Sequence, residues 1–129
     1  MTDKTITYLT DAVQITAVVQ KGRSDDILRA CRDLGVAGGV VHLARGTGAR
    51  ERLGLLGIAV ETEKEVVTMV VAADLRELIA ETIYHTGGLD APGGGYLYIS
   101  QLERLATYIP QEILARMDDA KNVSADSPS

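Results

Sequence analysis

The amino-acid sequence predicts an α+β fold whose elements follow the order β-α-β-β-α-β. Each half of the chain reads as a strand, a helix and a second strand, so the pattern is repeated once. A long, glycine-broken segment separates the second strand from the third. This order is the split-βαβ, ferredoxin-like pattern, and it predicts an antiparallel four-stranded sheet with both helices on one face.

The first half opens with a strand over residues 13–20, which alternate and then run apolar. Lys21–Gly22 interrupt that strand. Ser24 is suited to the N-cap of a helix, and Asp25–Asp26 place negative charge at its positive end. Gly35 is suited to end the helix. The expected apolar face of this helix is Ile27, Leu28, Cys31 and Leu34.

The second half is built in the same way. A second strand over residues 39–44 is followed, after the long loop, by a third over 66–71. The third is almost wholly apolar, which is typical of a strand buried on both faces or at a subunit interface. Asp74 and Glu77 resemble a capping box. Gly87–Gly88 end the second helix, whose expected inner face is Leu75, Leu78, Ile79, Thr82 and Ile83.

The fourth strand is expected over Tyr96–Leu102, where polar and apolar residues alternate. Pro110 opens a short helix. We expect an N-terminal extension over residues 1–12, one domain over 13–117 and a disordered tail over 118–129. The strands are too apolar to leave the second sheet face in water, which predicts self-association.

Composition narrows the class of protein. The chain has 129 residues, 46% of them apolar, which suffices for one domain with an aliphatic core. A net charge of −5 argues against general nucleic-acid affinity. The single cysteine fits a reducing cytosol. Because no apolar run reaches the roughly 18–20 residues of a membrane span and no secretory signal is visible, we expect a cytoplasmic protein without direct membrane insertion.

Residues that could carry catalysis are few. His42 lies within a strand and His85 at a helix end, and neither has a cysteine or acid at metal-ligand spacing. Cys31 falls on the apolar face of a helix, which indicates a core residue. Ser24 and Ser100 lack the strand-turn-helix context of a nucleophile. We therefore expect no catalytic or metal site, and a protein that is not an enzyme.

Two glycine clusters remain, one at residues 45–48 after the second strand and one at 90–95 before the fourth. Backbone N–H groups in glycine turns can form anion-binding nests. Alternatively, these glycines only supply positive φ angles for turns. Neither cluster matches a P-loop or a dinucleotide fingerprint, so the motifs alone favour the structural interpretation. We expect the clusters at opposite ends of one subunit or across a subunit boundary.

Residues 38–48, 64–71 and 90–99 resemble the P-II signal-transduction family, and more closely its divergent P-II-like branch. The resemblance spans roughly residues 13–109 and rests on the order of elements, both glycine turns and the long loop. It implies a homotrimer that regulates a target enzyme or membrane transporter, as in nitrogen regulation. It also implies a docking T-loop over about 45–63 and an adenine-nucleotide site between subunits, for ATP, ADP, AMP or a cyclic nucleotide.

Carried over by position, the implied nucleotide-binding residues are Val40, Gly46, Thr47, Gly48, Thr68, Val70, Gly93, Gly94 and Gly95. The implied partner-docking residues of the T-loop are Arg50, Arg52, Leu53, Leu55 and Leu56.

The chain departs from the family at its charged positions. Tyr96 stands where ATP-binding members have a lysine, and Thr107 and Ile109 stand where they have arginines. Arg50 replaces the glutamine that helps to bind 2-oxoglutarate and metal, and the loop lacks the tyrosine that is uridylylated. Charge-assisted hydrogen bonds are about twice as strong as neutral ones. The departures therefore favour a less charged ligand such as AMP or a cyclic nucleotide, or none.

Arg104 or Arg45 could compensate in part for the missing cations. Two alternatives to nucleotide sensing stay open. One is a ligand-independent trimeric adaptor with a degraded nucleotide site, in which the glycines are structural. The other, which the scarcity of cysteine and histidine disfavours, is a ferredoxin-like metal-tolerance protein or small enzyme.

Overall fold

The computed structural model describes residues 5–36, 38–46 and 62–116. The chain groups into two compact units. Thr10–Arg104 form the larger one. The smaller one combines the two ends of the chain, Met1–Leu9 and Leu105–Ser129. Each unit is described by itself below.

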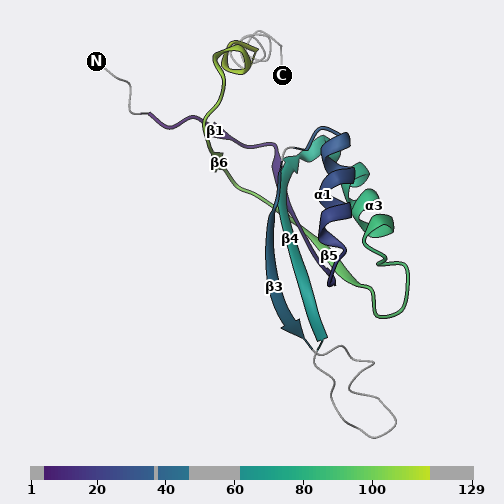
Figure 1. Ribbon diagram of the computed structural model, residues 1–129. Coiled ribbons are helices and arrows are strands. Elements are labelled where there is room, and N and C mark those ends of the chain that lie inside the picture. Colours follow the sequence, from purple (N-terminus) through teal and green to yellow (C-terminus); the bar gives the residue numbers. More distant parts are fainter. Residues whose placement is uncertain (1–4, 37, 47–61, 117–129) are drawn as a thin grey trace, which may run out of the picture. The chain divides into compact units, whose positions relative to one another are not determined.

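The larger unit confirms the predicted α+β fold and its β-α-β-β-α-β order (Figure 1). Its sheet has four strands in the order β3-β4-β2-β5, and every neighbouring pair is antiparallel. Both helices cover the same face of this sheet (Figure 1). The elements are β2 (Ala12–Gln20), α1 (Ser24–Asp33), β3 (Val40–Gly46), β4 (Thr62–Ala72), the 3₁₀ turn η1 (Ala73–Leu75), α3 (Arg76–Thr86) and β5 (Gly95–Gln101).

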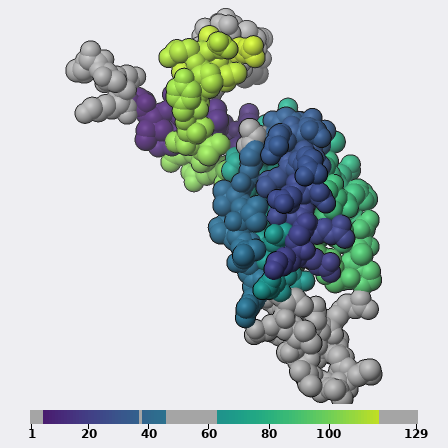
Figure 2. All heavy atoms as spheres, in the orientation of Figure 1, coloured from purple at the N-terminus to yellow at the C-terminus, as the bar shows by residue number. Residues whose placement is uncertain are grey.

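The core lies between this face and the helices. Successive side chains of a strand point to opposite faces, so alternate residues of β2 and β4 share the helix side. Figure 2 shows α1, in dark blue, packed over the sheet beside β3. The core confirms Ile27, Cys31, Ile79 and Ile83 of the predicted helix faces, and Leu28 and Leu75 are partly buried against it. The prediction is wrong for Leu34 and Leu78, which are 37% and 45% exposed. The buried set is Val13, Ile15, Ala17, Val19, Ile27, Cys31, Val36, Val67, Met69, Val71, Ile79 and Ile83.

Both predicted side-chain caps are wrong. Arg23, not Ser24, is the N-cap of α1, and it makes no side-chain capping bond. The carboxylate of Glu65 on β4 takes that role, because it accepts hydrogen bonds from backbone N–H groups at the start of α1. The N-cap of α3 is Leu75, again without a side-chain bond. Asp74 instead lies inside η1, where backbone hydrogen bonds replace the predicted capping box.

The predicted helix ends are confirmed. Gly35 follows α1 with a φ of 96°, a left-handed value that favours glycine. After α3, the Gly87 N–H donates to the Ile83 carbonyl at 2.7 Å, and Gly88 has a φ of 72°. These turns set the direction in which the chain enters β3 and the second glycine cluster.

Within the described part of the larger unit, no helix covers the sheet face turned away from α1 and α3, although Thr16 on that face is only 4% exposed. Val67 and Met69 of β4 are buried on the helix side, whereas Val70 on the other side is 41% exposed. Burial of this strand on both faces is therefore wrong for the single chain, and the alternative of a subunit interface stays a prediction. We call this surface the open face; its apolar and aromatic side chains are Val18, Val40, Val66, Val70, Tyr96 and Tyr98.

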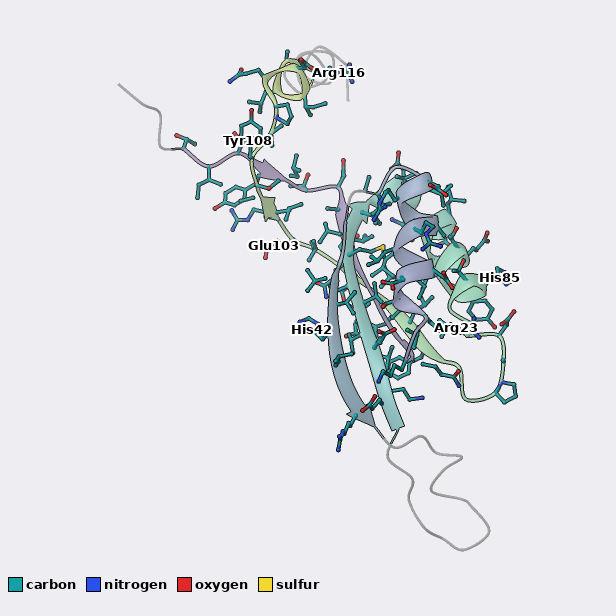
Figure 3. The ribbon with its side chains drawn as sticks, viewed as in Figure 1. Arg23, His42, His85, Glu103, Tyr108 and Arg116 are labelled. Atoms are coloured by element: carbon teal, nitrogen blue, oxygen red, sulfur yellow. The ribbon has the colours of Figure 1, made fainter. Side chains whose placement is uncertain are left out.

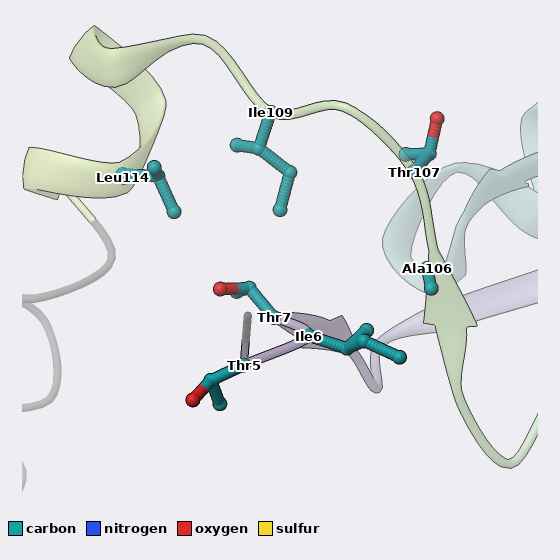
Figure 4. Close-up of a pocket in the computed structure, with 7 residues that line it drawn as sticks. All are labelled: Thr5, Ile6, Thr7, Ala106, Thr107, Ile109 and Leu114. Atoms are coloured by element: carbon teal, nitrogen blue, oxygen red, sulfur yellow. The ribbon is translucent and has the colours of Figure 1, made fainter. Parts of the chain in front are cut away.

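The smaller unit pairs β1 (Tyr8–Leu9) with β6 (Leu105–Ala106) in an antiparallel ladder. A helix over residues 111–116 follows Pro110, as predicted. These segments surround a hollow of about 450 Å³ (Figure 4). Folding of residues 13–117 as one domain stays a prediction, and the predicted tail at 118–129 lies outside the described residues. The hollow is lined by Thr5, Ile6, Thr7, Ala106, Thr107, Ile109 and Leu114.

Candidate functional site

The two glycine clusters lie at the same end of the sheet. β3 ends at Gly46, which is paired with Thr62 at the start of β4. β5 begins at Gly95, which is paired with Val19 near the end of β2. The expectation that one subunit would carry them at opposite ends is therefore wrong. Each helix returns the chain to the end where the preceding strand began, so β3 finishes and β5 starts at one common end.

The clusters lie on opposite edges of that end. β3 and β5 are the two outer strands, with β4 and β2 between them. Neighbouring strands are about 4.8 Å apart, so three spacings separate the edges by roughly 14 Å. Within one chain, the two glycine clusters therefore do not converge on a single point.

The second glycine cluster forms a tight turn in which the Gly94 N–H donates to the Ala91 carbonyl at 3.0 Å. A β-carbon on Gly94 would overlap the Gly88 carbonyl oxygen, and one on Gly95 would overlap that of Val18. The fold itself therefore requires glycine at these two positions. Gly93 differs, because a β-carbon there would have no atom within 4 Å. Of the three glycines of this turn, Gly93 is the one with open space where a side chain would be.

The first cluster is described only at Gly46, the last residue of β3. A hollow of about 290 Å³ lies beside it, at the base of the long loop. Its lining is Leu43, Ala44, Arg45 and Glu63. The remaining implied residues of the loop lie outside the described part of the chain; they are Thr47, Gly48, Arg50, Arg52, Leu53, Leu55 and Leu56.

The three implied adenine-side residues are brought together on the open face. Val40 is the register partner of Thr68, and Val70 lies two residues further along β4 on the same face. Val40 is 58% exposed and Thr68 is half-buried. The strands therefore present two exposed valines and a half-buried threonine on the open face at the β3 edge.

The positions that hold phosphates in the family carry no positive charge here. Tyr96 is 59% exposed and stacks on Tyr98, with ring centroids 6.4 Å apart. Thr107 and Ile109 belong to the smaller unit. Of the two arginines that could compensate, Arg104 lies 4.0 Å from Glu103. Arg45 is the register partner of Glu63, a carboxyl whose pKa is lowered chiefly by Lys21 and to a smaller extent by Arg45.

The sequence predicted the break after Gln20, but it did not reveal the contacts that the turn from Gln20 to Ser24 makes with β4 and the second glycine cluster. Lys21 Nζ contacts Glu63 Oε2 at 2.7 Å, at the base of the long loop. Glu65 Oε1 accepts from the N–H groups of Gly22 at 2.7 Å and Ser24 at 3.1 Å. The partners are 41 to 43 residues apart, so only the register of β2 against β4 could have revealed them.

These contacts shift the pKa values of the groups involved. The hydrogen bond from Lys21 lowers the pKa of Glu63, and the same bond raises that of Lys21. The Ser24 and Gly22 N–H groups lower the pKa of Glu65 against an opposing effect of burial. Three charges at the loop base are thus held in their ionised forms.

The remaining candidates for chemistry do not converge. His85 Nδ1 lies 3.5 Å from a carboxylate oxygen of Asp90, and both side chains are exposed. Figure 3 shows His85 at the end of α3 and His42 on β3. Burial raises the pKa of the Cys31 thiol. Within the described ranges, no group of three or more His, Cys, Asp and Glu side chains could hold a metal ion. In the same part of the chain, no helix is long and apolar enough to cross a membrane.

Comparison with known proteins adds one structural likeness. No family model and no curated protein sequence matches the chain. The fold is similar to the crystal structure of Arabidopsis thaliana PII bound to citrate, with a TM-score of 0.56 and 21% sequence identity. The match covers 73% of this chain and 79% of that one. The chain therefore has a PII-like fold.

Proposed function

We propose that the chain is a P-II-like regulatory protein that forms a homotrimer and binds an adenine nucleotide between subunits. The loop over residues 45–63 would then dock on a target enzyme or transporter. In this proposal the protein is cytoplasmic, is not an enzyme and binds no nucleic acid. The PII-like fold supports the regulatory class. The placement of the glycine clusters supports the site between subunits.

That placement is the observation that carries the proposal. The clusters share one end of the sheet but lie on opposite edges, roughly 14 Å apart. In a ring, the β3 edge of one subunit faces the β5 edge of the next. A ligand in the cleft could then contact Gly46 of one chain and Gly93 of its neighbour. The same closure would place Val40, Thr68 and Val70 beside the cleft.

The open face supports self-association. Val70 is 41% exposed, and Tyr96 and Tyr98 are 59% and 49% exposed. An apolar surface of this kind is typical of protein interfaces. We expect a molar mass three times that of the 13.8 kDa chain in light scattering at micromolar concentration. The molar mass of a monomer under these conditions would show that the proposed trimer and the cleft between its subunits are both wrong.

The chemistry of the cleft favours a ligand with few phosphate charges. Tyr96 supplies no cation, and Arg104 and Arg45 both have acidic neighbours. We expect calorimetric titration to give tighter binding of AMP or a cyclic nucleotide than of ATP. If AMP, ADP, ATP and cyclic nucleotides all fail to bind, the nucleotide-sensing part of the proposal is wrong.

Gly94 and Gly95 favour the alternative, a ligand-independent trimeric adaptor, because the fold alone requires glycine at both positions. The variant Gly93→Asn separates the two functions. It adds a side chain into open space, and Asn tolerates the positive φ of 77° at this position. Nucleotide sensing predicts weaker nucleotide binding at unchanged stability. The adaptor predicts no change in either property.

The docking role of the loop is tested with a chain that lacks residues 49–60. We expect the full chain to retain a target from native lysate and the shortened chain to lose it. Addition of the nucleotide that binds best should change the amount of target retained by the full chain. Equal retention by both chains would exclude the loop as the docking element.

A further inference from the structure

The turn Gln20–Ser24 contacts two segments. One is the start of β4, which pairs with the end of β3, and the other contains the second glycine cluster. On one side, Gln20 Nε2 donates to the Gly93 carbonyl at 3.1 Å, in the middle of the second cluster. On the other, Lys21 Nζ donates to Glu63 Oε2 at 2.7 Å, and Glu63 is the register partner of Arg45 at the base of the long loop. Neighbouring side chains of one turn thus reach toward opposite edges of the sheet.

Other residues of the turn also lie close to these two segments. The N–H groups of Gly22 and Ser24 both donate to Glu65 on β4. On the β5 side, the guanidinium carbon of Arg23 lies 3.5 Å from where a β-carbon on Gly88 would be. Figure 3 shows Arg23 at the N-terminal end of α1. Four of the five residues of the turn, all but Arg23, therefore form a hydrogen bond to one of the two segments.

We infer that Gln20 and Lys21 are positioning residues that tie the first residues of β4 to the second glycine turn. A change at one segment would then alter the other. The inference rests on the two glycine clusters of the proposed function, but the link is a property of the single chain and needs no nucleotide. Through this link, a molecule that binds at Gly93 could act on the base of the long loop.

The chemistry of the contacts suits a link of this kind better than a role in global stability. The side chains of Lys21 and Glu63 are 64% and 52% exposed, and exposed ion pairs contribute little to folding. The ladder of β2 with β4 and β5 already holds the sheet together up to Gln20. Loss of the turn contacts should therefore increase local opening of the two segments while the core stays closed.

The test is hydrogen exchange with mass spectrometry on the full chain without nucleotide. Lys21→Met removes only the contact to β4, and Gln20→Ala removes only the contact to Gly93. We expect Lys21→Met to accelerate exchange about fivefold in residues 88–95, and Gln20→Ala to do the same in residues 63–66. Lys21→Arg keeps the positive charge and should restore the slow exchange.

Matched controls remove comparable contacts that do not involve the Gln20–Ser24 turn. Gln101→Ala removes the side-chain hydrogen bond from Gln101 of β5 to the Ala12 carbonyl of β2, at the opposite end of the sheet. Arg29→Met removes an exposed ion pair with Asp26 on α1. Neither should alter exchange in the two segments. Should each turn variant affect only the segment that its own side chain contacts, the link is wrong, whether or not a nucleotide binds.

Discussion

Substitution of Glu65 tests directly how the start of α1 is stabilised, because this carboxylate from β4 takes the place of a side-chain cap. Its Oε1 atom accepts from the Gly22 N–H at 2.7 Å and the Ser24 N–H at 3.1 Å. The negative charge also faces the positive end of the helix. We expect Glu65→Ala to destabilise the protein by leaving both N–H groups to water, and Glu65→Gln to have a smaller effect.

The magnitude follows from these two bonds. A hydrogen bond to a charged group contributes roughly 1.5–3 kcal/mol net, and loss of a helix cap costs roughly 0.5–2 kcal/mol. Glu65 is half-buried, so water replaces part of the interaction. We therefore expect about 2 kcal/mol for Glu65→Ala, or a decrease of roughly 8 °C in Tm for a unit of this size. Glu65→Gln keeps an acceptor without the charge and should cost about 1 kcal/mol.

The assay is urea denaturation at pH 7 and one fixed protein concentration, with Glu81→Ala on the exposed side of α3 as the control. The folded-state pKa of Glu65 lies below its ordinary value of about 4.5. Its contribution is therefore present above that pH and is lost as the pH falls through the lower folded-state pKa. The difference in free energy of unfolding between wild type and Glu65→Gln should become smaller below about pH 4.5. Equal stability of Glu65→Ala and Glu81→Ala at pH 7 would refute the capping role.

Three further outcomes are expected. Gly95→Ala should cost more than about 3 kcal/mol in urea denaturation, because the new β-carbon would overlap the Val18 carbonyl at a φ of 119°; wild-type stability would contradict the described turn. If the chain binds ATP, Tyr96→Lys, which introduces the cation that ATP-binding P-II proteins carry at this position, should tighten that binding about tenfold in calorimetry, and unchanged affinity would show that phosphates do not approach this position. The Cys31 thiol, 1% exposed, should react with a thiol reagent only after denaturation; rapid labelling of the native protein would contradict its burial.

The elements could be predicted from the sequence because their signals are local. Alternation of apolar residues over 13–20 needs no knowledge of the partner strand, and Val13, Ile15, Ala17 and Val19 are buried as it predicts, although Thr16 is buried as well. Gly35 ends α1 because a left-handed φ favours glycine wherever it occurs. Both signals depend only on a few neighbouring residues.

The site could not be predicted in the same way, because its contacts depend on register. Ser24 has the right side chain for a cap, but Glu65 competes for the same N–H groups from a strand 41 residues later in the sequence. Once β2 is aligned antiparallel with β4, Gln20 opposes Lys64, and the acids at 63 and 65 fall beside the turn. Helix propensity contains no information about that alignment.

The same register decides what the glycine clusters can do. Gly94 and Gly95 are explained by overlap with backbone oxygens, so their presence does not indicate a ligand. Gly93 and Gly46, in contrast, lie on edges that no strand of the described chain covers. Two half-sites separated by two inner strands can serve one small ligand only if a second subunit brings the edges together. Ligand binding and assembly are then thermodynamically linked, and each must strengthen the other.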